Sequence, residues 1–233
     1  DGFITTTNTA RDVILRNYPN LDPQRFEVIP HGRDFQQMNQ FAQTPATGEP
    51  LRLVIPGNIS PAKGGELILE LAKMVPSEVL EIHILGNVSP LLALPSSVIC
   101  HGGYRREQFA DKIAAIGPHL GAVLSIWPET WCHTLTELWA AGIPVLGLNI
   151  GAVGERIADT HGGWLVDEFS AAAIWTMLQS VHLEDEWSAK HTAVLNWQQS
   201  TGKTQTRALM GQQYLATYTR VWGQHSVNAS LPN

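Results

Sequence analysis

Between residues 51 and 166, short apolar runs bounded by Gly or Pro alternate with segments of helical periodicity, and this alternation constrains the fold more than any other feature of the chain. Strands are expected at residues 51–55, 80–85, 98–100, 122–126, 144–148 and 163–166, and helices at residues 64–74, 105–116, 134–141 and 153–158. Apolar strands that alternate with helices are typical of a parallel sheet covered on both faces. The pattern therefore predicts an α/β domain with a doubly wound, Rossmann-like parallel sheet.

The flanking segments are expected to form further elements. These are a strand at residues 2–6, a helix at 8–18, a short strand at 26–29, a linker at 42–50 and, after Ser170, helices at 171–181, 184–197 and 204–222. Asn8 is the expected N-cap of the first helix, because its side-chain oxygen can accept a hydrogen bond from a backbone N–H in the first turn. The prediction is thus a sheet domain with extra helices at its C-terminal end.

Composition excludes several classes of protein. The 233 residues include 15 Lys and Arg against 21 Asp and Glu, a net charge of −6, so the chain lacks the basic field that nucleic-acid binding needs. No run approaches the roughly 20 apolar residues that cross a bilayer. Two cysteines, Cys100 and Cys132, are too few for a disulfide framework and suit reduced thiols. We therefore expect a cytoplasmic protein with no nucleic-acid partner.

Ligand-binding residues are expected at the carboxyl ends of the strands, where parallel α/β sheets place loops and helix N-termini. Three loops are candidates: residues 57–64, Gly86 together with residues 102–104, and residues 127–137. The first is neither a P-loop nor a Gly-x-Gly-x-x-Gly dinucleotide turn. It ends in Lys63 at the start of a helix, where an ammonium group can bind an anion. The alternative is that Lys63 is a solvated surface side chain.

Two carboxylates frame the last of these loops. Seven residues separate Glu129, before a predicted helix, from Glu137, about one turn inside it. A carboxylate can accept hydrogen bonds from two neighbouring hydroxyls, so sugar diols are natural partners. The backbone N–H groups of His133, Thr134 and Leu135, at the helix start, can bind phosphate between them. Either carboxylate alone is more often a solvated side chain, but both together with an anion-binding loop are a stronger signal.

In their order along the chain, these features resemble the retaining nucleotide-sugar glycosyltransferases of the GT-B architecture, glycosyltransferase family four. Three motifs carry the resemblance: residues 29–34 for the family's Pro-Asn-Gly-Val-Asp, residues 57–64 for its Gly-Arg-x-x-x-x-Lys-Gly, and residues 129–137 for its Glu-x7-Glu. The runs at 127–130, 134–137 and 141–145 are similar to the bacterial polysaccharide branch in particular. The resemblance covers residues 26–166.

The resemblance implies a donor site for a sugar that is transferred to a glycan or polysaccharide acceptor. It implies catalytic roles for Lys63, at the donor diphosphate, and Glu129, at the hydroxyls of the transferred sugar. Further donor contacts are implied for Glu137, at the ribose, and for Gly57, Asn58, Gly86, Tyr104, His133, Thr134 and Leu135. No metal or cofactor is expected, since Lys63 and the helix terminus would stabilise the leaving diphosphate. UDP- or GDP-linked sugars are the expected donors.

The resemblance also divides the chain. Residues 1–45 are expected to be the end of an acceptor domain and the interdomain linker, residues 46–200 the donor domain, and residues 201–233 a helix returning toward the acceptor domain. The chain begins with Asp1 and would be one half of a GT-B enzyme. We expect it to bind a nucleotide sugar weakly and to transfer nothing alone. The full enzyme could associate with the periphery of the inner membrane.

Two departures from the family motifs bear on the site. Asn58 replaces the family's Arg, which removes a charged, bidentate phosphate partner. Arg33, Arg105 and Arg106 are the candidates to replace it. Within residues 129–137, Cys132 stands where the family often has Gly.

Two other functions remain open at this point. A non-catalytic module that binds a sugar nucleotide or glycan is favoured by Asn58, but such a module has no chemical need for Lys63, Glu129 and Glu137 together. A sugar-nucleotide epimerase should show a dinucleotide-binding turn, which the sequence lacks.

Overall fold

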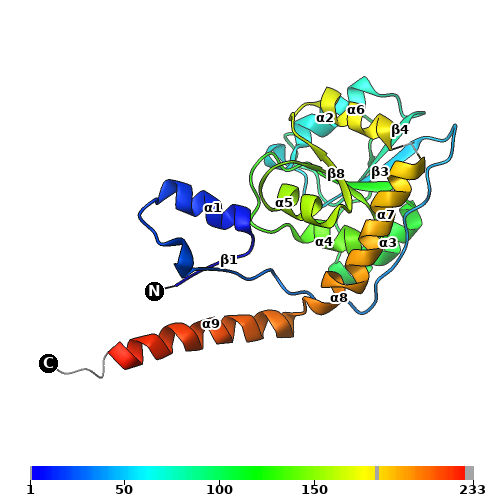
Figure 1. The fold of residues 1–233 in the computed structure, drawn as a ribbon. Helices are drawn as coiled ribbons and strands as arrows, with labels where there is room; N and C mark the ends of the chain where they lie inside the picture. The colour runs from blue at the N-terminus through cyan, green and yellow to red at the C-terminus, as the bar shows by residue number, and fades with distance from the viewer. Residues whose placement is uncertain (1, 182–183, 229–233) are drawn as a thin grey trace.

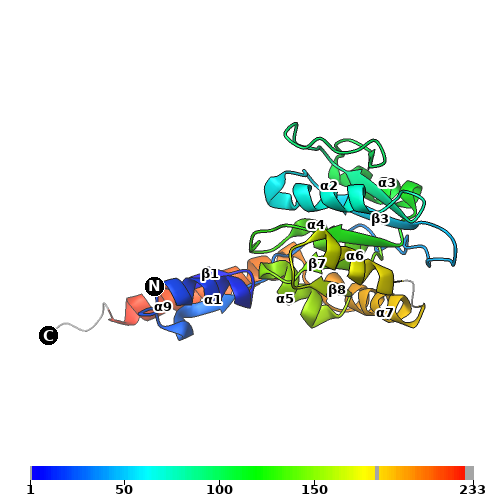
Figure 2. The same ribbon diagram turned by 90° about the horizontal axis from the view of Figure 1, so that it is seen from above.

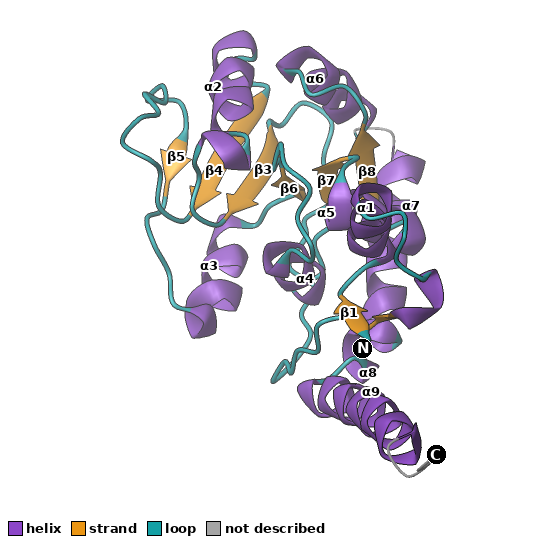
Figure 3. Ribbon diagram, turned by 90° about the vertical axis from the view of Figure 1, so that its left-hand side faces the viewer, coloured by secondary structure: helices purple, strands orange, loops and turns teal. Residues whose placement is uncertain are grey.

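The computed structural model describes residues 2–181 and 184–228, and in them the predicted α/β fold is confirmed (Figures 1 and 3). The main sheet consists of β3 (Leu51–Pro56), β4 (Leu80–Leu85), β5 (Ile99–Cys100), β6 (Leu120–Val123), β7 (Val145–Leu148) and β8 (Gly163–Val166). All neighbours are parallel, in the order β5-β4-β3-β6-β7-β8. The order reverses between β3 and β6, which marks the crevice where such sheets bind ligands.

Helices cover both faces of this sheet, as Figure 3 shows. They are α2 (Gly65–Met74), α3 (Phe109–Ile116), α4 (His133–Ala140), α5 (Gly151–Thr160), α6 (Ala171–Ser180) and α7 (Glu184–Gln199). Successive residues of β3 serve the two layers: Leu53 and Ile55 lie in the core with α2 and α6, and Val54 lies in the core with α3, α4 and α5. Burial on both faces explains why the strands are apolar throughout.

A smaller unit, which we call the arm, is formed by residues 2–28. In it β1 (Phe3–Thr5) pairs in parallel with β2 (Phe26–Val28) around α1 (Asn8–Asn17) and a 3-10 turn, η1 (Pro23–Arg25). The arm lies to one side of the main sheet, beside α9 (Arg207–Asn228), in both Figure 1 and Figure 2. Glu27 of the arm accepts a hydrogen bond from Thr217 of α9 at 2.6 Å.

The predicted N-cap of α1 was wrong by one residue. Thr7 is the N-cap, and its hydroxyl accepts a hydrogen bond from the N–H of Ala10 at 3.2 Å. The backbone N–H and side-chain amide of Asn8 both donate instead to Glu155 Oε1, at 2.9 and 3.1 Å. Asn8 is drawn into this contact because the Glu155 carboxylate sits at the helix N-terminus, where negative charge is favoured.

Residues 29–35 lead from the arm to the main sheet, and residues 200–206 lead from the main sheet to α9. These two segments lie side by side. Gln205, next to α8 (Thr201–Thr204), donates to the carbonyl of Pro30 at 2.9 Å and accepts from the N–H of Arg33 at 3.0 Å. A Cβ at Gly32 would lie 2.1 Å from the carbonyl oxygen of Thr206, so only glycine allows this approach. We call residues 29–35 the crossover.

Residues 42–50 form no helix or strand, as predicted. The predicted division at residues 45 and 200 stays a prediction, and residue 1 and residues 229–233 of its outer segments lie outside the described residues. None of the helices among residues 2–181 and 184–228 is both long and apolar enough to cross a membrane.

Candidate functional site

The loops after β3 and β4 meet at the carboxyl edge of the sheet. Gly57 donates its N–H to the carbonyl of Leu85 at 2.9 Å. A Cβ at Gly86, whose φ is +150°, would lie 1.9 Å from the carbonyl oxygen of Gly57, so a side chain here is excluded. A Cβ at Gly57 would lie 3.6 Å from Thr134 Cγ2. Both loops therefore stand next to the first turn of α4.

Lys63 and Glu129 form an ion pair at this edge. Lys63 ends a 3-10 turn, η2 (Pro61–Lys63), and its Nζ lies 2.6 Å from Glu129 Oε1, which also accepts a short hydrogen bond from the Ser125 hydroxyl. Gly64 brings the two loops together, because a Cβ there would lie 2.1 Å from the carbonyl oxygen of Leu124. The side chain of Lys63 is 38% exposed and that of Glu129 is 11% exposed. The ammonium group is thus open to solvent while the carboxylate is sheltered.

The charge of Glu129 is stabilised by its neighbours. Burial alone would raise the pKa of this carboxyl, but the hydrogen bonds from Lys63 and Ser125 outweigh that effect and lower the pKa below its ordinary value. Glu129 is therefore a carboxylate at neutral pH and can accept hydrogen bonds from hydroxyl groups.

Glu137 lies one turn into α4 and forms a second, more buried ion pair. Its Oε1 is 2.5 Å from Arg33 Nη2 of the crossover, and the side chains are 9% and 10% exposed. Tyr104 donates to Oε2 at 3.4 Å, and Arg106 Nε lies 3.9 Å from Oε1. Burial, and then the adjacent Glu137 carboxylate, raise the pKa of the Tyr104 phenol, which stays protonated and able to donate.

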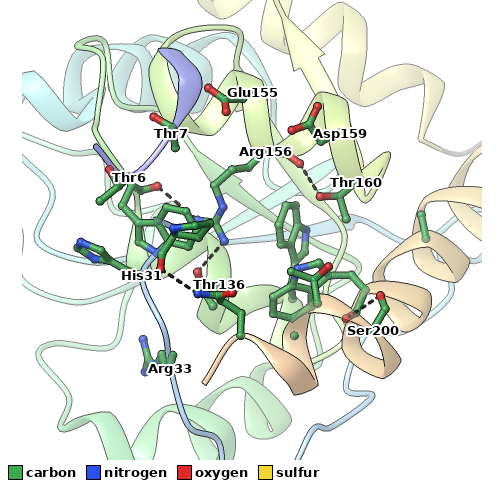
Figure 4. Close-up of a pocket in the computed structure, with 18 of the residues that line it drawn as sticks. Thr6, Thr7, His31, Arg33, Thr136, Glu155, Arg156, Asp159, Thr160 and Ser200 are labelled. Carbon is green, nitrogen blue, oxygen red and sulfur yellow. Dashed lines mark hydrogen bonds between the residues drawn. The ribbon is translucent and has the colours of Figure 1, made fainter. Parts of the chain in front are cut away.

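The start of α4 is held by a buried arginine that the sequence did not indicate. Arg156 of α5 donates to the carbonyls of Cys132 and Trp131 at 2.9 and 3.3 Å and to the Thr136 hydroxyl at 2.8 Å. Figure 4 shows it reaching from α5 to Thr136. Its guanidinium also lies 3.9 Å from the centre of the Trp131 ring. These contacts hold Cys132 in the left-handed region, at φ +81°, where the resembled family often has glycine.

The remaining predicted residues differ in what they offer a ligand. Leu135 is fully buried, so only its backbone N–H can serve, whereas His133 is exposed and Thr134 is partly exposed. His133 Nε2 lies 3.3 Å from Nδ1 of His31 in the crossover. Partial burial, followed by the positive charge of nearby groups, lowers the pKa of His133. Asn58 is exposed, and its side-chain oxygen accepts from Asn87 at 3.2 Å.

The predicted residues thus gather around the first turn of α4 in two groups. Lys63 and Glu129 form one, Tyr104 and Glu137 the other, and Gly57 approaches Thr134 directly. Three further contributors were missed: Ser125, His31 and Arg156. Of these, His31 carried a signal, because it stands where the resembled motif has Asn. Arg33 was named as a candidate to replace the charge lost at Asn58, but its pairing with Glu137 was not predicted.

A cleft of about 570 Å³ adjoins this site between the arm, the crossover, α4, α5 and α7 (Figure 4). Its lining includes His31, Arg33, Trp131 and Arg156, but not Lys63, Glu129 or Glu137. Within the described part of the chain, no three His, Cys, Asp or Glu side chains are grouped so that they could hold a metal ion.

Known proteins similar to this chain are glycosyltransferases and a sucrose-phosphate synthase. A D-inositol 3-phosphate glycosyltransferase from Rhodococcus jostii (strain RHA1) is 26% identical over 203 residues, which cover 78% of this chain and 44% of that protein. The structure of a sucrose-phosphate synthase from Thermosynechococcus elongatus has a TM-score of 0.73 at 18% identity, over 95% of this chain and 58% of that one. Anabaena Alr3699/HepE in complex with UDP and glucose has a TM-score of 0.68 at 15% identity, over 93% of this chain and 62% of that one.

At such identities the two structures show the fold alone. The chain spans less than two thirds of the length of each of these relatives. The family model for glycosyl transferases group 1 matches residues 36–192, which include the whole main sheet and both ion pairs except Arg33. On this match over most of its length, the chain belongs to the glycosyl transferases group 1 family.

Proposed function

We propose that this chain is the donor-binding half of a retaining GT-B glycosyltransferase of family four. In this proposal the enzyme transfers a sugar from a UDP- or GDP-linked donor to a glycan or polysaccharide acceptor. The observation that carries the proposal is the arrangement around the first turn of α4, where a solvent-accessible ammonium group and two sheltered carboxylates surround a helix N-terminus.

Lys63 is the group that stabilises the leaving diphosphate. When a donor binds, the Lys63 ammonium can exchange Glu129 for a phosphate oxygen at little cost, because its side chain is partly solvated already. Backbone N–H groups at His133 and Thr134 would add the partial positive charge of the helix N-terminus. The bond from the anomeric carbon to the diphosphate oxygen would then break with its charge already neutralised.

Glu129 is assigned to the hydroxyl groups of the transferred sugar. Its Oε2 atom takes no part in the contacts with Lys63 and Ser125, which both use Oε1. An ionised carboxylate accepts hydrogen bonds only, and so it orients hydroxyl donors. Retention would follow from attack of the acceptor oxygen on the face that the diphosphate leaves.

Glu137 is assigned to the ribose hydroxyls. Arg33 occupies Oε1, while the Tyr104 hydroxyl lies at the long distance of 3.4 Å from Oε2. Each carboxylate oxygen has two lone-pair sites, so acceptor capacity remains for a ribose diol. The loops at Gly86 and Tyr104 would then border the base.

The relatives give this proposal its substrate class. The Anabaena protein is described in complex with UDP and glucose, and the Rhodococcus relative is named a glycosyltransferase. Because the chain spans less than two thirds of such proteins, the acceptor site is assigned to a further domain, and the chain alone is expected to bind a donor weakly without transfer. That the full enzyme is cytoplasmic and associates with the periphery of the inner membrane stays a prediction.

Thermal unfolding with ligands tests the donor site. UDP, GDP, ADP and their sugar conjugates are added in turn, and stabilisation should grow as RT ln(1+[L]/Kd), about 2.7 kcal/mol at a hundredfold excess over Kd. The shift should shrink for Lys63→Met and Glu137→Gln but persist for Glu70→Gln, a surface variant on α2. No shift with any nucleotide would contradict the proposal, and an unchanged shift in Glu137→Gln would contradict the ribose assignment.

A non-catalytic sugar-nucleotide or glycan-binding module is the second candidate. Asn58 favours it, because an amide tied to Asn87 cannot supply the charge of the arginine that it replaces. A longer chain that includes the acceptor domain separates the two functions. If that protein binds the donor but neither transfers nor hydrolyses its sugar, the binding module is the correct description.

A further inference from the structure

Arg33 presents a buried hydrogen-bond donor without a partner in the part of the chain that the structure describes. The residue is 9% exposed, and its Nη2 is engaged by Glu137. Its Nη1 has no hydrogen-bond partner among residues 2–181 and 184–228, although the atom is removed from solvent. A buried guanidinium N–H without an acceptor costs free energy, so an acceptor is expected when the site is in use.

The groups around Arg33 define the charge of that acceptor. His133, the first residue of α4, lies close enough for the charge of Arg33 to lower the pKa of its imidazole, after the larger effect of burial. His31 lies two residues before Arg33 and contacts His133. Arg106 Nε lies 3.9 Å from the same Glu137 oxygen that Arg33 contacts. Among the described residues, the carboxylate that contacts Arg33 is Glu137, which is already paired, and the helix N-terminus adds partial positive charge, so the missing acceptor is an anion.

The structure also distinguishes Arg33 from the two other arginines that could replace the charge lost at Asn58. The side chain of Arg106 is 68% exposed, so a contact from it would need the ordering of a solvated chain. Arg105 is exposed at the start of a 3-10 turn, η3 (Arg106–Gln108), where its N–H donates to Gln108 at 3.0 Å. Arg33 alone of the three is held in place before any ligand arrives.

The crossover explains why Arg33 is held so firmly. The Arg33 N–H donates to Gln205, and the guanidinium packs over the Phe35 ring at 4.9 Å. Glu137 engages Nη2 of the guanidinium, and Nη1 has no partner among the described residues. Because Nη1 is removed from solvent, a phosphate oxygen reaches it only when the groups that cover it move aside, but the guanidinium itself is already oriented to donate.

We propose that Arg33 donates its free Nη1 edge to a phosphate of the donor, and so supplies from the crossover the cationic contact that residue 58 lacks. This inference rests on the proposed function, because it assigns a partner to the diphosphate of the same donor site. It adds a donor-binding residue on the crossover, outside the loop of residues 57–64 where the resembled family has its arginine. Donor binding would then also contact the segment that joins the main sheet to the arm.

Calorimetric titration with ligands of increasing phosphate number tests the contact. The ligands are the nucleoside, its 5′-monophosphate and its 5′-diphosphate, in the uracil and guanine series, together with inorganic pyrophosphate. For the wild-type chain the affinity should rise with each phosphate. In Arg33→Met the ratio of diphosphate to nucleoside affinity should fall about tenfold or more, because a charged hydrogen bond is lost. Arg106→Met, the matched control, should change this ratio less than about threefold.

Two further variants separate a phosphate contact from mere positioning of Glu137. Glu137→Gln breaks the ion pair but keeps Arg33, so it should weaken nucleoside and diphosphate by the same factor. Arg33→Lys keeps a charge, should give a ratio between those of the wild type and Arg33→Met, and serves if Arg33→Met does not fold. If Arg33→Met folds and weakens nucleoside and diphosphate equally, or if Arg33→Lys behaves as Glu137→Gln does, Arg33 only positions Glu137 and the inference fails.

The same titrations distinguish this inference from the proposed function. Pyrophosphate binding that depends on Arg33, without binding of any nucleotide, would support the anion site and contradict the nucleotide-sugar function. If nucleotides bind and the ratio of diphosphate to nucleoside affinity is unchanged in Arg33→Met, the nucleotide-sugar function is supported and the Arg33 phosphate contact is contradicted. Failure of the wild-type chain to bind both kinds of ligand would overturn both.

Discussion

The two acidic residues of the candidate site lie on the same short segment, yet they stand in different environments. Glu129 is on a loop and pairs with Lys63, whose side chain is 38% exposed. Glu137 is on a helix and pairs with Arg33, with both side chains about nine-tenths buried. The first pair joins two loops of the main sheet, and the second joins the main sheet to the crossover.

This difference indicates different tasks for the two pairs. A partly solvated lysine loses little when it exchanges its partner for a ligand, because its ammonium group is already in contact with water. A buried pair cannot be opened without leaving a charge in a poorly solvated place. The Lys63 pair is therefore suited to ligand exchange, whereas the Arg33 pair is suited to hold a fixed frame.

The largest effect on stability is expected from the buried pair. Arg33→Met leaves the Glu137 carboxylate buried with Tyr104 and Arg106, whose Nε lies 3.9 Å away, as its partners among the described residues, and should lower the free energy of unfolding by about 3–5 kcal/mol. Urea denaturation followed by circular dichroism measures this. In a double-mutant cycle, Arg33→Met with Glu137→Leu should recover much of the loss. A single-mutant loss below about 1 kcal/mol would show that the pair is solvated, and the contrast with Lys63 would disappear.

A smaller loss of stability is expected for Arg156, which holds the end of the loop that carries Glu129. Arg156→Met removes the donors to the carbonyls of Trp131 and Cys132 and should destabilise the chain by about 1–3 kcal/mol, the cost of leaving buried acceptors unpaired. Since Cys132 is held at positive φ by these bonds, binding of a nucleotide sugar should weaken more than binding of the free nucleotide. If the nucleotide sugar and the free nucleotide are weakened equally, Arg156 acts through Glu137, the residue assigned to the ribose, and not through Glu129.

The sequence predicted the part of this arrangement that depends on local pattern. Strand and helix periodicity located the main sheet, and the loop positions of Lys63 and Glu129 followed from strand ends. The Arg33 to Glu137 pair joins residues 104 positions apart through a crossover with no periodicity, so no local rule reports it. Arg156 was missed for the same reason, because its partners are backbone carbonyls of another element.

The Lys63 pair should depend less on its cation than the Arg33 pair does. Lys63→Met should lower the free energy of unfolding by less than Arg33→Met does, by about 1–2 kcal/mol, because the ammonium is partly solvated while the sheltered Glu129 carboxylate keeps Ser125 as a donor. The same variant should weaken nucleoside diphosphate binding about tenfold or more through the loss of a charged contact. Denaturation and calorimetry on one preparation measure both. A loss of stability comparable with that of Arg33→Met would contradict the division of tasks.

The smallest effect concerns the acid side of the stability curve and belongs to Glu129. Its pKa is lower in the folded chain than its ordinary value, so the unfolded chain binds more protons in the interval between the two values. The stabilisation from this group is therefore complete above the ordinary value and is lost as the pH falls through the lower, folded one. The unfolding free energies of the wild type and of Glu129→Gln are measured from about pH 6 to about pH 3. The difference between them should shrink as the pH falls, by less than about 1 kcal/mol in total. In a Lys63→Met background the convergence should weaken, because burial then opposes the charge with Ser125 and Cys132 as the remaining donors. An unchanged convergence there would assign the lowered pKa to Ser125 and Cys132 and would show that Lys63 does not stabilise the Glu129 carboxylate.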